Sequence, residues 1–171
     1  MKRILSLTLC LFFVLAAGAS VLAAEYEPTE LFLEALEEDD FYLDEYDFEY
    51  ELLGLNDNDD ERVLVSFDME DVPDMDVFVY FMDTETSCTM YLWDVIAFDE
   101  SDFDDVVEIC NTLNNNYRFA RWYAMDDNTV NAQVDAIFRT GDGCGKTLVE
   151  TLSMLIRVAE AGYPSLTEYA V

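Results

Sequence analysis

Apolar side chains alternate with polar ones through much of the first half of the chain. Between residues 45 and 98, the alternating or continuous apolar runs are Tyr46–Leu52, Val63–Met69, Val77–Met82 and Cys88–Phe98. A spacing of two residues is typical of β-strands that bury one face. Short segments rich in turn-forming residues separate the runs, so we expect four consecutive strands with antiparallel pairing.

Helical spacing replaces this alternation after residue 98. One apolar stripe is formed by Phe103, Val106, Val107, Cys110 and Leu113. This spacing predicts an amphipathic helix. Ser101 is its expected N-terminal cap, and the asparagines at positions 114–116 are its expected end.

A second hairpin is predicted directly after this helix. Residues Tyr117–Met125 are rich in aromatic side chains, as strands are. After the acidic turn at 126–128, apolar and polar residues alternate over Val130–Phe138, and only Ile137 interrupts the polar face. We expect these two runs to form neighbouring antiparallel strands.

Two further helices are predicted, one at each end of this region, at Pro28–Glu38 and Leu148–Ala159. The order of elements is then α-β-β-β-β-α-β-β-α. This order predicts an α+β fold, in which an antiparallel sheet of about five to six strands carries its helices on one face. We expect one domain, to which residues 24–44 contribute the first helix and an acidic lead-in, and residues 45–171 the rest.

The N-terminal residues differ in character from everything that follows. Lys2 and Arg3 are followed by the apolar run Ile4–Leu15 and then by small residues up to Ala24. This pattern predicts a secretory signal peptide, residues 1–23, with cleavage after Ala23 or Ala24. An uncleaved membrane anchor is the alternative, but the apolar run is shorter than the ~20 residues that span a bilayer. We therefore expect a secreted or extracytoplasmic protein without a membrane span after processing.

Acidic residues dominate the composition. The chain holds 38 acidic and 8 basic residues, and removal of Lys2 and Arg3 would leave six basic residues against all 38 acidic ones, a formal charge of −32. Such a charge repels phosphate groups, so nucleic acids are excluded as partners. It also gives solubility, and it attracts basic partners or divalent cations.

The common catalytic mechanisms lack their residues here. Because the chain has no histidine, Ser–His–Asp and Cys–His mechanisms are excluded. Cys88, Cys110 and Cys144 remain after processing and form no C-x-x-C pair, so we expect no structural zinc site and at most one disulfide bond. We predict a protein that is not an enzyme, with no catalytic residues, no cofactor and no metal site.

Two loops carry weaker patterns. The segment Gly141–Thr147 resembles a phosphate-binding loop, but Thr140 stands where that pattern requires glycine. We interpret it as a flexible connection to the last helix, with Thr147 and Glu150 as a capping box. The acidic loop at 57–61 offers oxygen ligands suited to calcium. A calcium-responsive acidic extracellular protein is therefore the alternative to a binding module.

Two of the few basic residues lie in the aromatic run before the second hairpin turn. Arg118, Arg121 and Trp122 are the candidate partner-binding residues, as an anchor for an acidic peptide. Ion pairs between these arginines and local acidic side chains, with the arginine stems stacked on aromatic rings, are the alternative. The sequence leaves the identity of the partner and the oligomeric state open.

The region from about residue 45 to the C-terminus resembles the YbjN-domain family. The matching features are the helix ending at Thr112–Asn114, the strand Tyr117–Tyr123, the acidic turn after it, and the helical stripe after Gly145. Members are bacterial proteins often described as sensory transduction regulators, with a fold similar to that of type III secretion chaperones. The resemblance implies an α+β domain without catalytic residues. Since members commonly lack a signal peptide, we expect a secreted protein- or peptide-binding module instead of a cytosolic regulator.

Overall fold

A computed structural model describes residues 23–39, 41–70 and 72–171. The predicted signal peptide therefore lies outside the described residues, except for Ala23. The elements in chain order are α1 (Glu27–Glu38), β1 (Asp47–Leu55), β2 (Glu61–Asp68), β3 (Met75–Phe81), β4 (Ser87–Ala97), α2 (Phe103–Asn116), β5 (Arg121–Ala124), β6 (Thr129–Ile137) and α3 (Cys144–Gly162). Short 3₁₀ turns, Glu100–Asp102 and Tyr163–Ser165, precede α2 and follow α3.

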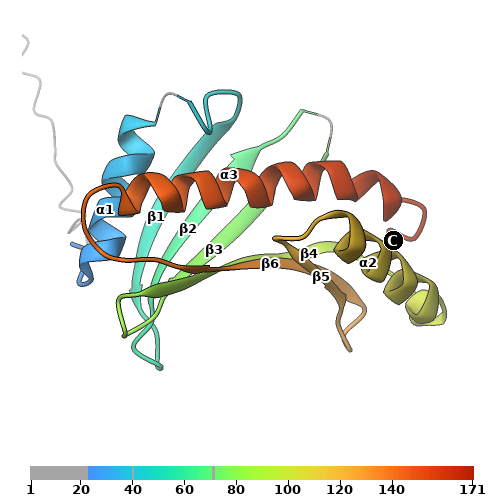
Figure 1. Ribbon diagram of the computed structural model, residues 1–171. Helices are drawn as coiled ribbons and strands as arrows, with labels where there is room; N and C mark the ends of the chain where they lie inside the picture. The colour runs from blue at the N-terminus through green and yellow to red at the C-terminus, as the bar shows by residue number, and fades with distance from the viewer. Residues whose placement is uncertain (1–22, 40, 71) are drawn as a thin grey trace, which may run out of the picture.

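The predicted α+β fold is confirmed. Six strands form one sheet in the order β1-β2-β3-β4-β6-β5, and each neighbouring pair is antiparallel. The first four strands follow one another as consecutive hairpins, while β6 returns to pair with β4 and carries β5 at its other side (Figure 1). The expected strand Val77–Met82 is β3, and it lies inside the sheet.

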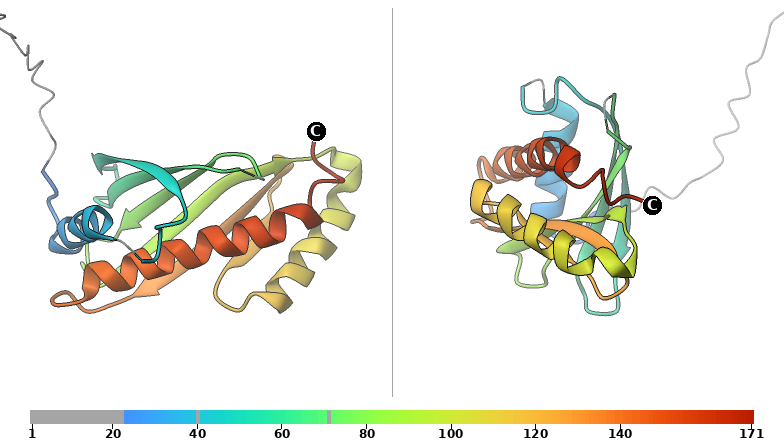
Figure 2. Two further views of the ribbon diagram at one scale, coloured as in Figure 1. Left: turned by 90° about the horizontal axis from the view of Figure 1, so that it is seen from above. Right: turned by 90° about the vertical axis from the view of Figure 1, so that its right-hand side faces the viewer.

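The core lies between one face of the sheet and the helices (Figure 2). The buried sheet residues on this face are Val63, Val65, Phe67, Val77, Val79, Phe81, Met90, Leu92, Ala132 and Val134. They occur at every second position of β2, β3, β4 and β6, so the alternation in the sequence corresponds to the inner face of the sheet. Phe32 of α1 and Leu148, Leu152 and Ile156 of α3 are fully buried against it.

The two outer helices approach each other very closely. Gly145, in the first turn of α3, lies so near the backbone of α1 that an added Cβ atom would overlap the carbonyl oxygen of Leu31 and stand 2.9 Å from Ala35 Cβ. Gly162, the last residue of α3, similarly faces the indole ring of Trp122, whose Cζ2 would be 2.6 Å from an added Cβ. Both glycines therefore serve packing between elements, which the helical stripe alone did not indicate.

Three local predictions are wrong. The expected strand Tyr117–Met125 contains only four strand residues, because 117–120 form the turn out of α2. Ser101 does not cap α2, since it lies within a 3₁₀ turn and Asp102 precedes the helix without a side-chain cap. The capping box of Thr147 and Glu150 is absent because α3 begins earlier, at Cys144, and the Thr147 hydroxyl instead donates to the Gly143 carbonyl (3.0 Å).

A side chain of α2 explains where β5 begins. The Asn114 amide oxygen accepts the Trp122 N–H (2.7 Å), and its amide nitrogen donates to the Trp122 carbonyl (2.8 Å). These two bonds satisfy the backbone of β5 on the side away from β6, as a neighbouring strand would. The asparagine predicted as a helix end thus also holds the outermost strand against α2.

Candidate functional site

Strand β6 has a neighbouring strand on only one side of its second half, residues 134–137. Its first half pairs with β5, from Val130–Ala124 to Gln133–Arg121. Residues 134–137 continue to pair with β4 on the other side. Because β5 extends no farther than Arg121, no strand of the described chain lies beside this half of β6. This half of β6 is therefore a free sheet edge, although the first half of the same strand is internal to the sheet.

The backbone groups that face this free edge follow from the alternation of hydrogen bonds. Met125 N–H donates to Thr129 C=O (2.8 Å) on the β5 side, and Phe138 N–H donates to Thr86 C=O (3.0 Å) on the β4 side. Odd-numbered residues of β6 therefore direct their N–H and C=O groups toward β5. By this alternation, the N–H and C=O groups of Asp135 and Ile137 face the open side, where an added strand would find them.

An apolar groove of about 500 Å³ lies along this edge. It lies between β6 and α3, and Phe119, from the segment before β5, also lines it. The lining residues are Phe119, Val134, Asp135, Ala136, Ile137, Phe138, Thr147, Glu150, Thr151 and Met154. Two of them are unusually exposed for large apolar side chains, with 71% of Phe119 and 89% of Ile137 accessible to solvent. Exposed apolar side chains gathered around a groove are typical of binding surfaces.

The three candidate residues from the sequence have different environments. Arg118 is exposed in the bend before β5, and Arg121 is exposed on β5, with its guanidinium 3.8 Å from the Asp135 carboxylate. Trp122 is only 2% exposed and belongs to the core. A partner could therefore touch the two arginines but not the indole ring in this conformation. The surrounding apolar residues Phe119 and Ile137 were not predicted as site residues, although Ile137 was recognised as the exception on a polar face.

A second surface with many aromatic side chains is the sheet face opposite the helices. Its aromatic residues are Phe78, Tyr80, Tyr91, Trp93 and Tyr123. The rings of Tyr91 and Trp93 stack with centroids 4.6 Å apart, and Tyr80 meets Tyr91 edge-on at 5.5 Å. Tyr123 donates its hydroxyl proton to the Gln133 side chain (2.6 Å). These rings contact one another and are mostly half-buried, so this face offers less free apolar surface than the β6 edge.

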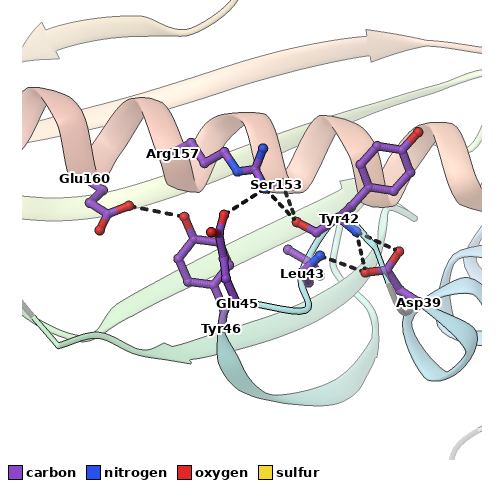
Figure 3. A network of polar contacts seen from close by, with 8 residues as sticks. All are labelled: Asp39, Tyr42, Leu43, Glu45, Tyr46, Ser153, Arg157 and Glu160. Atoms are coloured by element: carbon purple, nitrogen blue, oxygen red, sulfur yellow. Dashed lines mark hydrogen bonds and ion pairs between the residues drawn. The ribbon is translucent and has the colours of Figure 1, made fainter.

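A polar network joins the segment after α1 to α3 (Figure 3). The carbonyl of Tyr42 accepts hydrogen bonds from Ser153 (2.8 Å) and Arg157 (3.4 Å), and Arg157 also pairs with Glu45 (2.7 Å). Tyr46 donates to Glu160 (3.1 Å), and burial together with the charge of Glu160 raises the pKa of Tyr46 to about 12. These contacts connect the segment after α1 to α3, so we assign the network a structural role.

In the described part of the chain, the acidic loops show no arrangement typical of a metal site. Within residues 23–39, 41–70 and 72–171, no group of three or more Cys, Asp or Glu side chains is placed to hold a metal ion. The acidic loop is the turn from β1 to β2, where Asn56 and Asp60 bond to each other (3.1 Å). The calcium alternative stays a prediction.

The glycine-rich segment and the cysteines have structural environments. Gly141 and Gly143 have φ angles of +124° and +84°, which suit glycine in the turn from β6 to α3. This turn follows an antiparallel strand, unlike a phosphate-binding loop, which follows a parallel one. Cys88, Cys110 and Cys144 are buried and carry no disulfide bond in this structure. Burial raises the pKa of each of the three thiols, so none has the features of an activated nucleophile.

Comparisons with known proteins do not assign a family. A scan against protein-family models finds no match, and a search of curated proteins finds none either. The resemblance to the YbjN-domain family therefore stays a prediction. In the part of the chain that the structure describes, no helix has the length and apolar character needed to cross a membrane.

Proposed function

We propose that the protein is a secreted, non-enzymatic peptide-binding module that receives an extended segment of a partner at the free edge of β6. The observation that carries this proposal is the combination of unpaired strand edge and apolar groove at Asp135–Ile137. An extended peptide placed there would extend the sheet beyond β6, in the position that β5 leaves empty. This is the recognition mode known as strand addition.

Each part of the edge would contribute differently to binding. Hydrogen bonds to the N–H and C=O groups of Asp135 and Ile137 would fix the peptide's direction and register, each with a net gain of about 0.5–1.5 kcal/mol. Alternate side chains of the peptide would point into the groove beside Val134 and Met154, because strand side chains alternate between faces. Since only two residues offer backbone groups, most of the affinity would come from burial of apolar surface, at about 25 cal/mol per Å².

The charges around the edge favour a particular kind of segment. Of the six basic residues in the predicted mature chain, Arg118 lies three residues before β5, Arg121 is the first residue of β5, and Arg139 lies two residues after β6. They reduce the negative potential that the rest of the chain creates. We therefore expect a segment with apolar residues at alternating positions and with carboxylates, not ammonium groups, near its ends.

The proposal can be tested with a library of immobilised peptides about ten residues long and the purified chain from Glu25 to Val171. Ile137→Pro removes the N–H that faces the edge, yet Ile137 is 89% exposed and its N–H is not needed to pair with β4. Ile137→Thr keeps the N–H and the strand propensity but removes part of the apolar side chain. Phe41→Ser is a matched control, because Phe41 is also an exposed aromatic residue (69%) but is not among the residues that line the groove. It lies between α1 and β1.

We expect peptides with alternating apolar residues to be enriched on the wild-type protein and on Phe41→Ser. Ile137→Pro should abolish their binding, and Ile137→Thr should weaken it by several-fold. If the enriched peptides bind all three variants equally, the edge of β6 is not the site. Far-UV circular dichroism of each variant would show whether the sheet itself is intact.

A further inference from the structure

Glu61, the first residue of β2, is a buried carboxylate, and no basic side chain of the described residues forms an ion pair with it. Its exposed fraction is 0%, and it is among the largest fully buried side chains of the protein. The described part of the chain has two ion pairs within 4 Å, Arg121–Asp135 and Arg157–Glu45. Glu61 takes part in neither of them. A buried carboxylate that lacks a positive partner lowers the stability of the folded state. Buried carboxylates are therefore usually paired with a positively charged group.

The groups that do meet Glu61 come from the start of the predicted mature chain. Its Oε1 accepts the backbone N–H of Glu25 (2.7 Å), and its Oε2 accepts the N–H of Tyr26 (3.0 Å). Tyr26 immediately precedes α1, and its own hydroxyl donates to the Asp59 carbonyl (2.5 Å) in the turn before β2. The start of the predicted mature chain is thus bound to the β1–β2 hairpin at two points.

Glu25 is also the first residue after one of the two predicted cleavage positions. We propose that the signal peptide is removed between Ala24 and Glu25, and that the new α-ammonium group of Glu25 forms an ion pair with the buried carboxylate of Glu61. In this step a signal peptidase uses water to hydrolyse the Ala24–Glu25 peptide bond. The water oxygen enters the new carboxyl group of Ala24, and the released nitrogen of Glu25 takes up protons to become an ammonium group. The proposal rests on the signal-peptide prediction and is independent of the peptide-binding edge.

The geometry distinguishes the two cleavage positions that the sequence left open. The nitrogen 2.7 Å from the carboxylate belongs to Glu25, whereas the nitrogen of Ala24 lies one residue earlier in the chain. Before cleavage, this nitrogen is an amide that offers one hydrogen bond to Glu61. After cleavage at this position, it offers a full positive charge at the same place, next to a carboxylate that is itself fully buried. Maturation would therefore stabilise the folded protein and hold its new N-terminus on the hairpin.

The first experiment identifies the N-terminus directly. The full chain with its own signal peptide is expressed in a bacterium, and the exported form is analysed by N-terminal sequencing and intact mass. We expect Glu25 as the first residue. If the exported form begins at Ala24 or at any other residue, the proposed cleavage site is wrong.

The second experiment measures the ion pair in the mature chain. Lys146 is the only lysine after residue 24, so a Lys146→Arg background leaves the α-amine as the sole amine and allows selective acetylation. Acetylation keeps the N-terminal nitrogen as a hydrogen-bond donor but removes its charge. The same modification on Glu61→Gln is the matched control, because glutamine keeps a hydrogen-bonding side chain of equal size without the charge.

We expect acetylation to lower the folding equilibrium constant about tenfold, about 1.4 kcal/mol, when Glu61 is present. In the Glu61→Gln chain it should change that constant by less than threefold. Equal effects in the two chains would show that the charges do not interact. Should Glu61→Gln fail to fold, NMR titration of the α-amine in the unmodified chain decides the matter, since an ion pair raises the amine pKa above its ordinary value of about 7.7–8.0 and an unchanged pKa contradicts it.

Discussion

The close approach of α1 and α3 at Gly145 leads to a specific prediction for Gly145→Ala. An added Cβ would overlap the Leu31 carbonyl oxygen, stand 2.7 Å from the Leu31 carbonyl carbon and 2.9 Å from Ala35 Cβ. Two of these three atoms belong to the backbone of α1, so no rotation of a side chain can relieve the contact. The helices must separate or shift along each other, and both movements loosen the packing of Phe32 and Leu148 below them.

The expected size of the effect is the difference between two opposing contributions. Overpacking of a well-filled core costs about 1–3 kcal/mol. Alanine is favoured over glycine in a helix by about 1 kcal/mol at most, and Gly145 lies only in the first turn of α3. We therefore expect Gly145→Ala to lower the free energy of unfolding by about 1–2 kcal/mol. For a domain of this size, the melting temperature should fall by roughly 2–8 °C.

Urea and thermal unfolding followed by circular dichroism would measure this change. Gly143→Ala is the control, because an added Cβ there meets no atom within 4 Å and its cost comes only from the φ angle of +84°. Adding Ala35→Gly to Gly145→Ala removes the contact with Ala35 Cβ but leaves the clash with Leu31, so it should restore little stability. A Gly145→Ala protein as stable as the wild type, or more stable, would refute the packing of α1 against α3 described above.

Three further predictions concern the side chains that hold the sheet and core together. Asn114→Ala removes both hydrogen bonds to the Trp122 backbone and should lower the free energy of unfolding by about 2 kcal/mol, measured by urea unfolding. Asn115 is exposed, so Asn115→Ala should have no measurable effect in the same assay. Because the pKa of Tyr46 is raised to about 12 in the folded state, this hydroxyl ionises at lower pH in the unfolded chain than in the folded one. The free energy of unfolding should therefore fall as the pH rises from about 10 to 12. Tyr46→Phe should reduce this loss, as measured by thermal unfolding across that pH range. Iodoacetamide at about pH 8 should leave the thiols of the folded, predicted mature chain (Glu25–Val171) largely unmodified. After unfolding in urea, mass spectrometry should find three alkylated cysteines in this mature chain, Cys88, Cys110 and Cys144. Rapid labelling of the folded chain would contradict their burial.

The sequence by itself determined the kind and order of the elements. Each strand and helix was predicted because the spacing of apolar residues is a property of neighbours in the chain, such as the alternation from Val63 to Phe67 or the stripe from Val106 to Leu113. The same spacing predicted which side chains form the inner face of the sheet. Errors occurred at boundaries, as at Ser101 and Thr147, where the backbone of an adjoining turn decides whether a helix begins earlier.

Only the tertiary structure decided where the surface is open and where charge is buried. Asn114 reaches the backbone of β5 from α2, and the second half of β6 is free because β5 begins at Arg121. The environment of Glu61 depends on residues some 35 positions earlier in the chain, so nothing in its local sequence distinguished it from the other acidic residues. Local periodicity determines which face of an element is apolar, but exposure of an edge and enclosure of a carboxylate result from contacts between distant segments.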